Sequence, residues 1–110
     1  MNTENQVRQI LQDIELAMRA ISLWQTVPPP AEAFESNEPF SIDTMDAEQW
    51  LQWVLIPRMY ALLASNSPFP LRFAITPYFE EALSGDDRPD CTALLVQLQR
   101  LDDLLNKESN

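Results

Sequence analysis

The sequence predicts an all-α four-helix bundle with one long acidic, Pro-rich connection between the first two helices. Apolar residues recur at spacings of three and four in four segments, which is the pattern of one buried helical face. The chain has 1 Gly and no Asn-Gly or Asp-Gly hairpin turn, and all but one of its 9 prolines fall between these segments or at their boundaries. With 110 residues, a single helical-bundle domain over 1–110 is expected.

The first helix is predicted over about 4–25. Thr3 and Gln6 have the spacing of a capping box at its start, and the prolines at 28–30 cannot continue it. Its apolar stripe consists of Val7, Ile10, Leu11, Ile14, Ala17, Met18, Ile21 and Trp24.

The connection over 25–49 is acidic and rich in proline. It contains no base, and its acids are Glu32, Glu35, Glu38, Asp43, Asp46 and Glu48. A structureless connection of this length is uncommon in a compact domain. Because it also carries Phe34, Phe40, Ile42 and Met45, we expect it to lie against the bundle.

The second helix is predicted over 46–64, with Asp46 as its cap and Gln49 as the partner of that cap. The helix is apolar nearly all round, so we expect it to be central. Pro57 interrupts it. A restart at Pro57 would make Ile56 the cap, a residue without a side-chain acceptor, so one kinked helix is favoured.

The third helix is predicted over 76–84, from Thr76-Pro77 to a stop at Gly85, with a backward extension through 73–75 as an alternative. The fourth helix follows, capped by Asp86, Asp87 or Asp90, with Pro89 in its first turn. Its stripe consists of Leu94, Leu95, Leu98, Leu101 and Leu105. The neighbouring acids Asp102-Asp103 and Asp86-Asp87 point in different directions and are expected to be solvated.

The composition excludes many catalytic and cofactor sites. There are 0 His, so a Ser-His-Asp triad and an H-E-x-x-H zinc site are both excluded. One Gly and a single Lys, Lys107, argue against a phosphate-binding loop and Schiff-base chemistry. We therefore expect no metal, no cofactor and no catalytic residues. One Cys and the lack of a signal peptide or membrane span predict a cytoplasmic protein that does not enter a membrane.

Several blocks resemble the YqcC-like family of small uncharacterised bacterial proteins. They are Pro39-Phe40, Asp43-Thr44, WLQWVLIPRM from Trp50 to Met59, Ala74-Ile75, and Pro77-Tyr78 with Glu80 to Leu83. The resemblance implies a small cytoplasmic helical bundle, often encoded beside a tRNA pseudouridine synthase and sometimes given that enzyme's name. A synthase of that kind is much larger and has a basic RNA-binding fold, whereas this chain has a net charge of −10.

Arg58 is the first candidate binding residue because it lies on the most apolar predicted helix. A buried guanidinium needs a carboxylate partner, and Asp43 and Glu80 are the candidates. The favoured interpretation is an ion pair that holds the connection to the second helix. The alternatives are a side chain that reaches water and an anion-binding site for a carboxylate or phosphate.

The other candidate binding residues are aromatic: Trp50, Trp53, Tyr60 and Tyr78. The spacing of Trp50 and Trp53 is that of one helix face and favours a place in the core. A partly open aromatic groove is the alternative, because Trp and Tyr are enriched at recognition sites.

We interpret the chain as a non-enzymatic accessory or protein-interaction module. Its acidic connection favours another protein with a basic surface as the partner, through which a link to tRNA modification would run. The net charge argues against direct binding to nucleic acid. The alternatives are a protein that binds a small apolar or anionic ligand near Arg58 and an enzyme based on carboxylates. The sequence leaves the oligomeric state open.

Overall fold

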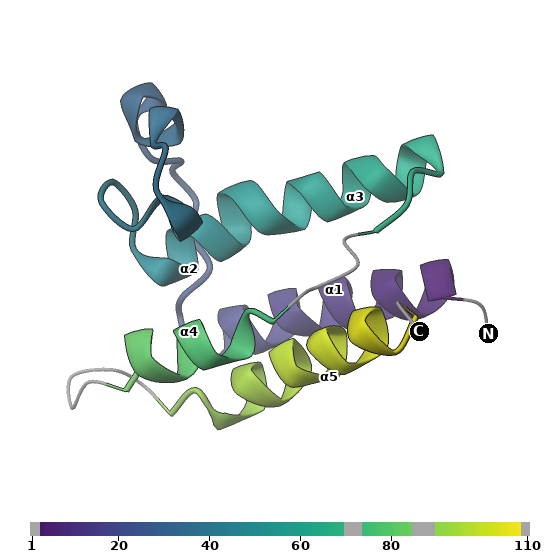
Figure 1. The fold of residues 1–110 in the computed structure, drawn as a ribbon. Coiled ribbons are helices and arrows are strands. Elements are labelled where there is room, and N and C mark those ends of the chain that lie inside the picture. Colours follow the sequence, from purple (N-terminus) through teal and green to yellow (C-terminus); the bar gives the residue numbers. More distant parts are fainter. Residues whose placement is uncertain (1–2, 70–73, 85–89, 109–110) are drawn as a thin grey trace.

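A computed structural model describes residues 3–69, 74–84 and 90–108 of the chain. All the secondary-structure elements within these residues are helices or helical turns, and none is a strand (Figure 1). They are α1 (Thr3–Ala20), the 3₁₀ turns η1 (Ala31–Glu35) and η2 (Pro39–Ser41), α2 (Ala47–Trp50), the π-helical turn η3 (Leu51–Leu55), α3 (Ile56–Ser65), α4 (Thr76–Ala82) and α5 (Thr92–Glu108). The predicted all-α bundle is confirmed.

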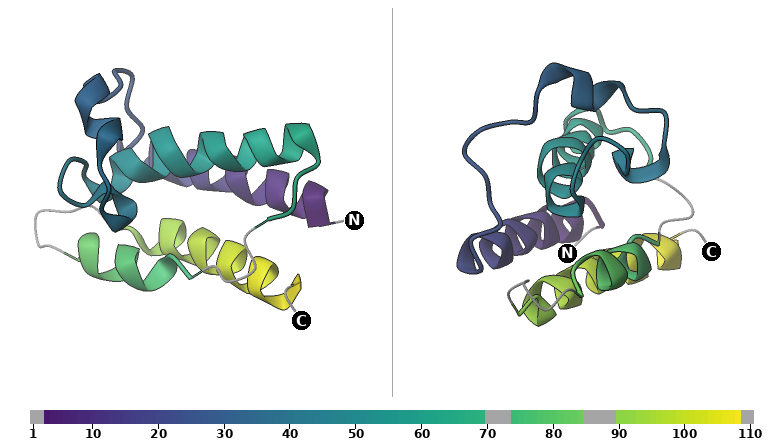
Figure 2. Two further views of the ribbon diagram at one scale, coloured as in Figure 1. Left: turned by 45° about the horizontal axis from the view of Figure 1, so that its top comes forward. Right: turned by 90° about the vertical axis from the view of Figure 1, so that its left-hand side faces the viewer.

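Four helical rods form the bundle, because α2, η3 and α3 run on as one. Figure 1 shows α1 and α5 side by side with opposite directions, the α2–α3 rod above α1, and short α4 along α5. The segment with η1 and η2 stands at one end of the α2–α3 rod (Figure 2). The fully buried side chains come from every rod and include Leu11, Ile14, Met18, Leu51, Met59, Phe79, Leu98 and Leu101.

Helix α1 ends five residues before the predicted end at about 25. Ser22 has a φ of 62°, the left-handed conformation that closes a helix. Its N–H donates to the carbonyl of Arg19 (3.2 Å), and the N–H of Leu23 donates to that of Met18 (2.8 Å). This pair of bonds is a Schellman motif. Trp24, assigned to the helical stripe, therefore lies in the following loop.

The second rod is continuous over Ala47–Ser65, as predicted, and η3 shows how it accommodates Pro57. Pro57 has no N–H to donate, and its ring would collide with the preceding turn of an α-helix. Directly before it the helix widens, so that the N–H of Ile56 donates to Leu51, five residues back. Asp46 and Gln49 form the predicted capping box, in which the N–H of Asp46 donates to Oε1 of Gln49 (2.8 Å).

The second rod contributes to the core as expected, but only one of its faces is buried. Ile56, Met59 and Leu63 of α3 are buried. Pro57 and Arg58, on the other side, are exposed. The sequence could not identify the open side, because apolar residues occupy nearly every position of the rod.

The acidic connection lies against the bundle through part of its apolar residues. Met45 is buried and Phe40 packs against the core, whereas Phe34 and Ile42 are exposed. Phe40 has a φ of 59°, which costs a non-Gly residue about 1 kcal/mol or more. That backbone turn directs its ring onto Tyr78 (centroids 4.1 Å apart) and Trp50 (4.8 Å).

Helix α4 receives its cap from α5. Its N-cap residue, Ile75, has no side-chain acceptor. The carboxylate of Asp102 accepts from the N–H of Ile75 (3.1 Å to each oxygen) and of Thr76 (2.9 Å). Asp102 is 3% exposed, so the expectation that it is solvated is wrong, whereas its neighbour Asp103 is exposed as expected. Helical periodicity turns Asp102 inward.

Helix α5 begins beside Asp90, one of the three predicted caps. The Asp90 carboxylate accepts from the backbone N–H (3.0 Å) and the hydroxyl (2.7 Å) of Thr92, and these two bonds lower the pKa of Asp90. In the predicted stripe Leu95 is half-buried and the other four leucines are buried. The predictions for Phe73, Gly85, Asp86, Asp87 and Pro89 lie outside the described residues.

Candidate functional site

The six predicted site residues do not form one site. Trp53 and Tyr60 line one groove, which we call the tryptophan groove, and Tyr78 lines another, the acidic groove. Trp50 belongs to an aromatic cluster beside the acidic groove. Asp43 and Arg58 line neither groove.

The predicted ion pair of Arg58 is absent from the described part of the chain. Arg58 is exposed on the open side of α3, and neither Asp43 nor Glu80 forms an ion pair with it. Asp43 instead accepts a hydrogen bond from the hydroxyl of Ser36. The physical reason is the one-sided burial of α3: a long side chain on its open face reaches water and needs no buried partner.

The acidic groove lies between the connection and α4 and has a volume of about 390 Å³. Ile42, Met45, Asp46, Ala47, Tyr78, Glu81 and Ala82 line it. Met45 and Ala47 are buried, whereas Ile42 is 60% exposed. The carboxylates of Asp46 and Glu81 are both exposed, and no Lys or Arg is among these described lining residues. The groove thus combines an apolar floor with negative charge.

Aromatic rings support one wall of the acidic groove. Phe40 stacks on Tyr78 with an interplanar angle of 11°, and Tyr78 meets Phe79 edge to face at 5.3 Å. Burial raises the pKa of the Tyr78 phenol above its ordinary value of 10.0, and the negative charges of Glu48 and Asp46 raise it further. Two carboxylates therefore act on the Tyr78 phenol at this wall of the groove.

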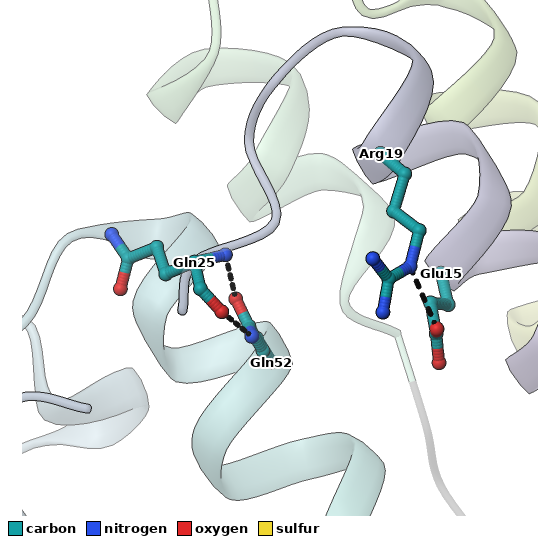
Figure 3. A network of polar contacts seen from close by, with 4 residues as sticks. All are labelled: Glu15, Arg19, Gln25 and Gln52. Carbon is teal, nitrogen blue, oxygen red and sulfur yellow. Dashed lines mark hydrogen bonds and ion pairs between the residues drawn. The ribbon is translucent and has the colours of Figure 1, made fainter. Parts of the chain in front are cut away.

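The tryptophan groove lies between the end of α1 and the second rod and has a volume of about 440 Å³. Its lining residues are Glu15, Trp24, Gln25, Gln52, Trp53, Ile56, Pro57 and Tyr60. Gln52 is 5% exposed and bonds both backbone groups of Gln25: its Oε1 accepts from the N–H (2.8 Å), and its Nε2 donates to the carbonyl (2.7 Å) (Figure 3). The indole N–H of Trp53 donates to Oε1 of Gln25 (3.2 Å).

An ion pair borders the tryptophan groove on α1. Nε of Arg19 lies 2.9 Å from Oε2 of Glu15, and Figure 3 shows the two side chains together on that helix. The guanidinium carbon of Arg19 also lies 5.1 Å from the centre of the Trp24 ring. Burial raises the pKa of Tyr60, the charge of Glu15 raises it further, and Arg8 lowers it.

Sequence reasoning missed most of the lining of both grooves. Glu15, Trp24 and Gln25 gave no signal beyond a helical pattern, and Gln52 and Glu81 stood out only as members of the blocks that carry the family resemblance. Within the described residues no three Cys, Asp or Glu side chains gather as a metal site would require. None of the described helices combines the length and hydropathy needed to cross a membrane. The absence of a cofactor and of catalysis remains a prediction.

Comparisons with known proteins place the chain in a family. The model of family DUF446, described as tRNA pseudouridine synthase C, matches residues 6–104. An uncharacterized protein of Haemophilus influenzae is 53% identical over 102 residues, which are 93% of this chain and 94% of that protein.

Protein YqcC of Escherichia coli is 41% identical over the full length of both chains. Its solution NMR structure matches with a TM-score of 0.86 over 100% of this chain and 93% of that one. A protein of Pectobacterium carotovorum named tRNA pseudouridine synthase C is 61% identical over 70 residues, which are 64% of this chain and 19% of that protein. The full-length likeness to YqcC and the match over residues 6–104 confirm the resemblance seen in the sequence, and the chain belongs to the DUF446 family.

Proposed function

We propose that this chain is a non-enzymatic accessory module that binds a basic surface of another protein through the acidic groove. The observation that carries the proposal is the groove itself, in which Asp46 and Glu81 flank an apolar floor that no described basic side chain neutralises. Exposed Ile42 at its edge offers apolar contact to a partner. An arginine or lysine of the partner, next to an apolar residue, complements this arrangement.

The proposed partner is an enzyme of tRNA modification, with a pseudouridine synthase as the first candidate. The Pectobacterium relative supports this choice, because the similar segment is only 19% of a protein that carries the synthase's name. A segment of this family and a much longer remainder thus occur in one polypeptide. Covalent linkage of that kind keeps two units close together at a high effective concentration. Two separate chains stay close together only if they bind each other, which is the interaction proposed here.

The chain is proposed to contact the enzyme and not the RNA. Affinity for nucleic acid comes mainly from cations that neutralise phosphates. With 17 acids against 7 bases, the chain repels a polyanion. The same charge attracts a basic RNA-binding protein and speeds their encounter at low ionic strength.

The test is a binding titration of the pure protein with the synthase encoded in the same genome, by calorimetry at 50 and 300 mM salt. The double variant Asp46→Asn/Glu81→Gln removes two charges while Asn retains the capping ability of position 46. We expect it to bind at least about tenfold more weakly, because two charge pairs across the interface are lost. Affinity of the unmodified protein is expected to fall with salt.

The control variant is Glu4→Gln/Asp103→Asn, which makes the same change in net charge at exposed positions outside the groove. Its affinity is expected to stay within about twofold of the original, since distant surface charges are screened. Equal weakening by both variants would mean that net charge alone attracts the partner. No binding at either salt concentration would reject the synthase as the partner.

A further inference from the structure

The tryptophan groove has the composition of an aromatic cage for an organic cation. The rings of Trp24, Trp53 and Tyr60 line it together with the carboxylate of Glu15. Aromatic faces carry negative electrostatic potential and attract weakly hydrated cations, and Trp does so most strongly. Glu15 is the one charged residue among these described lining residues.

A cation of this chain, the guanidinium of Arg19, already contacts two of the residues that line the groove. The guanidinium of Arg19 lies over Trp24 at 5.1 Å and is paired with Glu15 at 2.9 Å. The Arg19 side chain thus contacts the Trp24 ring and the Glu15 carboxylate at the same time, and a bound cation would make the same two contacts. The side chain of Arg19 is 55% exposed, so it can move away without disturbing the core.

Two of the polar side chains that line the groove are already bonded within the chain. The amide of Gln52 is bonded to both backbone groups of Gln25, and the indole N–H of Trp53 is bonded to the Gln25 side chain. The donors of Gln52 and Trp53 are therefore engaged within the chain. Arg58, the candidate anion-binding residue, lies outside the groove, and Arg8 donates to Asn5 (2.9 Å).

We propose that the tryptophan groove binds a weakly hydrated organic cation, a quaternary ammonium or a guanidinium, between Trp24, Trp53 and Tyr60, with Glu15 as its counter-ion and Arg19 as an internal competitor. The ligand is a small molecule or an arginine side chain of a partner. This proposal does not depend on the acidic groove, which lies on different residues.

The test is an NMR titration with choline, with arginine amide, and with 3,3-dimethylbutan-1-ol, the neutral isostere of choline. The 3 tryptophans provide three indole N–H signals. The signals of Trp24 and Trp53 are expected to shift in a saturable way, whereas that of Trp50, in the aromatic cluster, is expected to stay in place. Choline is expected to bind at least about tenfold more tightly than its isostere. Tighter binding of choline would identify the ligand as a small quaternary ammonium, and tighter binding of arginine amide would identify it as an arginine side chain of a partner.

Three variants separate binding from a structural effect. Glu15→Gln is expected to weaken choline binding about fivefold or more, while Glu4→Gln on the same helix leaves it unchanged. Tyr60→Leu is expected to weaken it by removing a ring that is already 36% exposed. Arg19→Ala is expected to strengthen it by freeing Glu15 and Trp24. Equal affinity for choline and its isostere, or weaker binding by Arg19→Ala, would overturn the proposal.

Discussion

Replacing Asp102 by Ala removes the acceptor that α5 supplies to the first amides of α4. The N–H groups of Ile75 and Thr76 then stay buried without a partner. An unsatisfied buried donor costs about 1–3 kcal/mol, so we expect the free energy of unfolding to fall by about 3 kcal/mol. For a domain of this size the total is about 5–15 kcal/mol, so the loss is a large fraction of it.

The assay is urea unfolding followed by far-ultraviolet circular dichroism, together with amide hydrogen exchange. A loss of about 3 kcal/mol corresponds to a fall in Tm of about 10–20 °C for a domain near 100 residues. Asp102→Asn keeps an uncharged acceptor and is expected to lose about half as much. The amides of Ile75 and Thr76 are expected to exchange faster in Asp102→Ala than in the original protein.

The control is Asp103→Ala, because Asp103 is the exposed neighbour of Asp102 on the same helix. Its effect is expected to stay within about 0.5 kcal/mol. If Asp103→Ala destabilises the protein as much as Asp102→Ala does, then helix α5 itself is the cause. The reasoning that Asp102 holds α4 would then be wrong.

Three further predictions follow from other contacts. Gln52→Ala is expected to lower the free energy of unfolding by about 2 kcal/mol, because it leaves both backbone groups of Gln25 without partners. Thermal melts of this variant and of the control Gln12→Ala, at an exposed position, measure the difference. Burial raises the pKa of Tyr60 and of Tyr78 above 10.0, the unfolded value, so the stability that these shifts confer is fully present below pH 10.0 and is lost as pH rises through the folded values. Urea midpoints and phenolate absorbance from pH 8 to 12 measure this loss, and a phenolate titration midpoint at or below pH 10.0 for these two residues would contradict it. Labelled tRNA is expected not to bind the pure protein at physiological salt, and micromolar binding in a filter assay would contradict the charge argument.

The helices could be predicted because their signals are local. Apolar spacing identified the buried faces of α1 and α5, and the capping box of Asp46 and Gln49 located the start of α2. The end of α1 was missed because Ser22 adopts a left-handed conformation that serine seldom takes. Once the helix ends there, Trp24 leaves the stripe and lines a groove.

The candidate sites could be predicted only as residue types. Aromatic richness pointed to four residues: Trp53, Tyr60 and Tyr78 line grooves, whereas Trp50 lies in the aromatic cluster. Within the described residues, the ion pair predicted for Arg58 does not form. The apolar neighbours of Arg58 in the sequence indicated that it is buried. Helix α3 buries only one face, however, and Arg58 lies on the exposed face.

The sequence by itself determined the class of fold, the family and the strong negative charge, because these depend on composition, on spacing within single helices and on motifs within one chain. Tertiary structure alone decided which polar side chains hold the bundle together. Gln52 bonds Gln25 and Asp102 bonds Ile75, each across 27 residues of sequence. A helix presents donors and acceptors at its ends regardless of its neighbours, but which distant side chain meets them depends on how the helices pack.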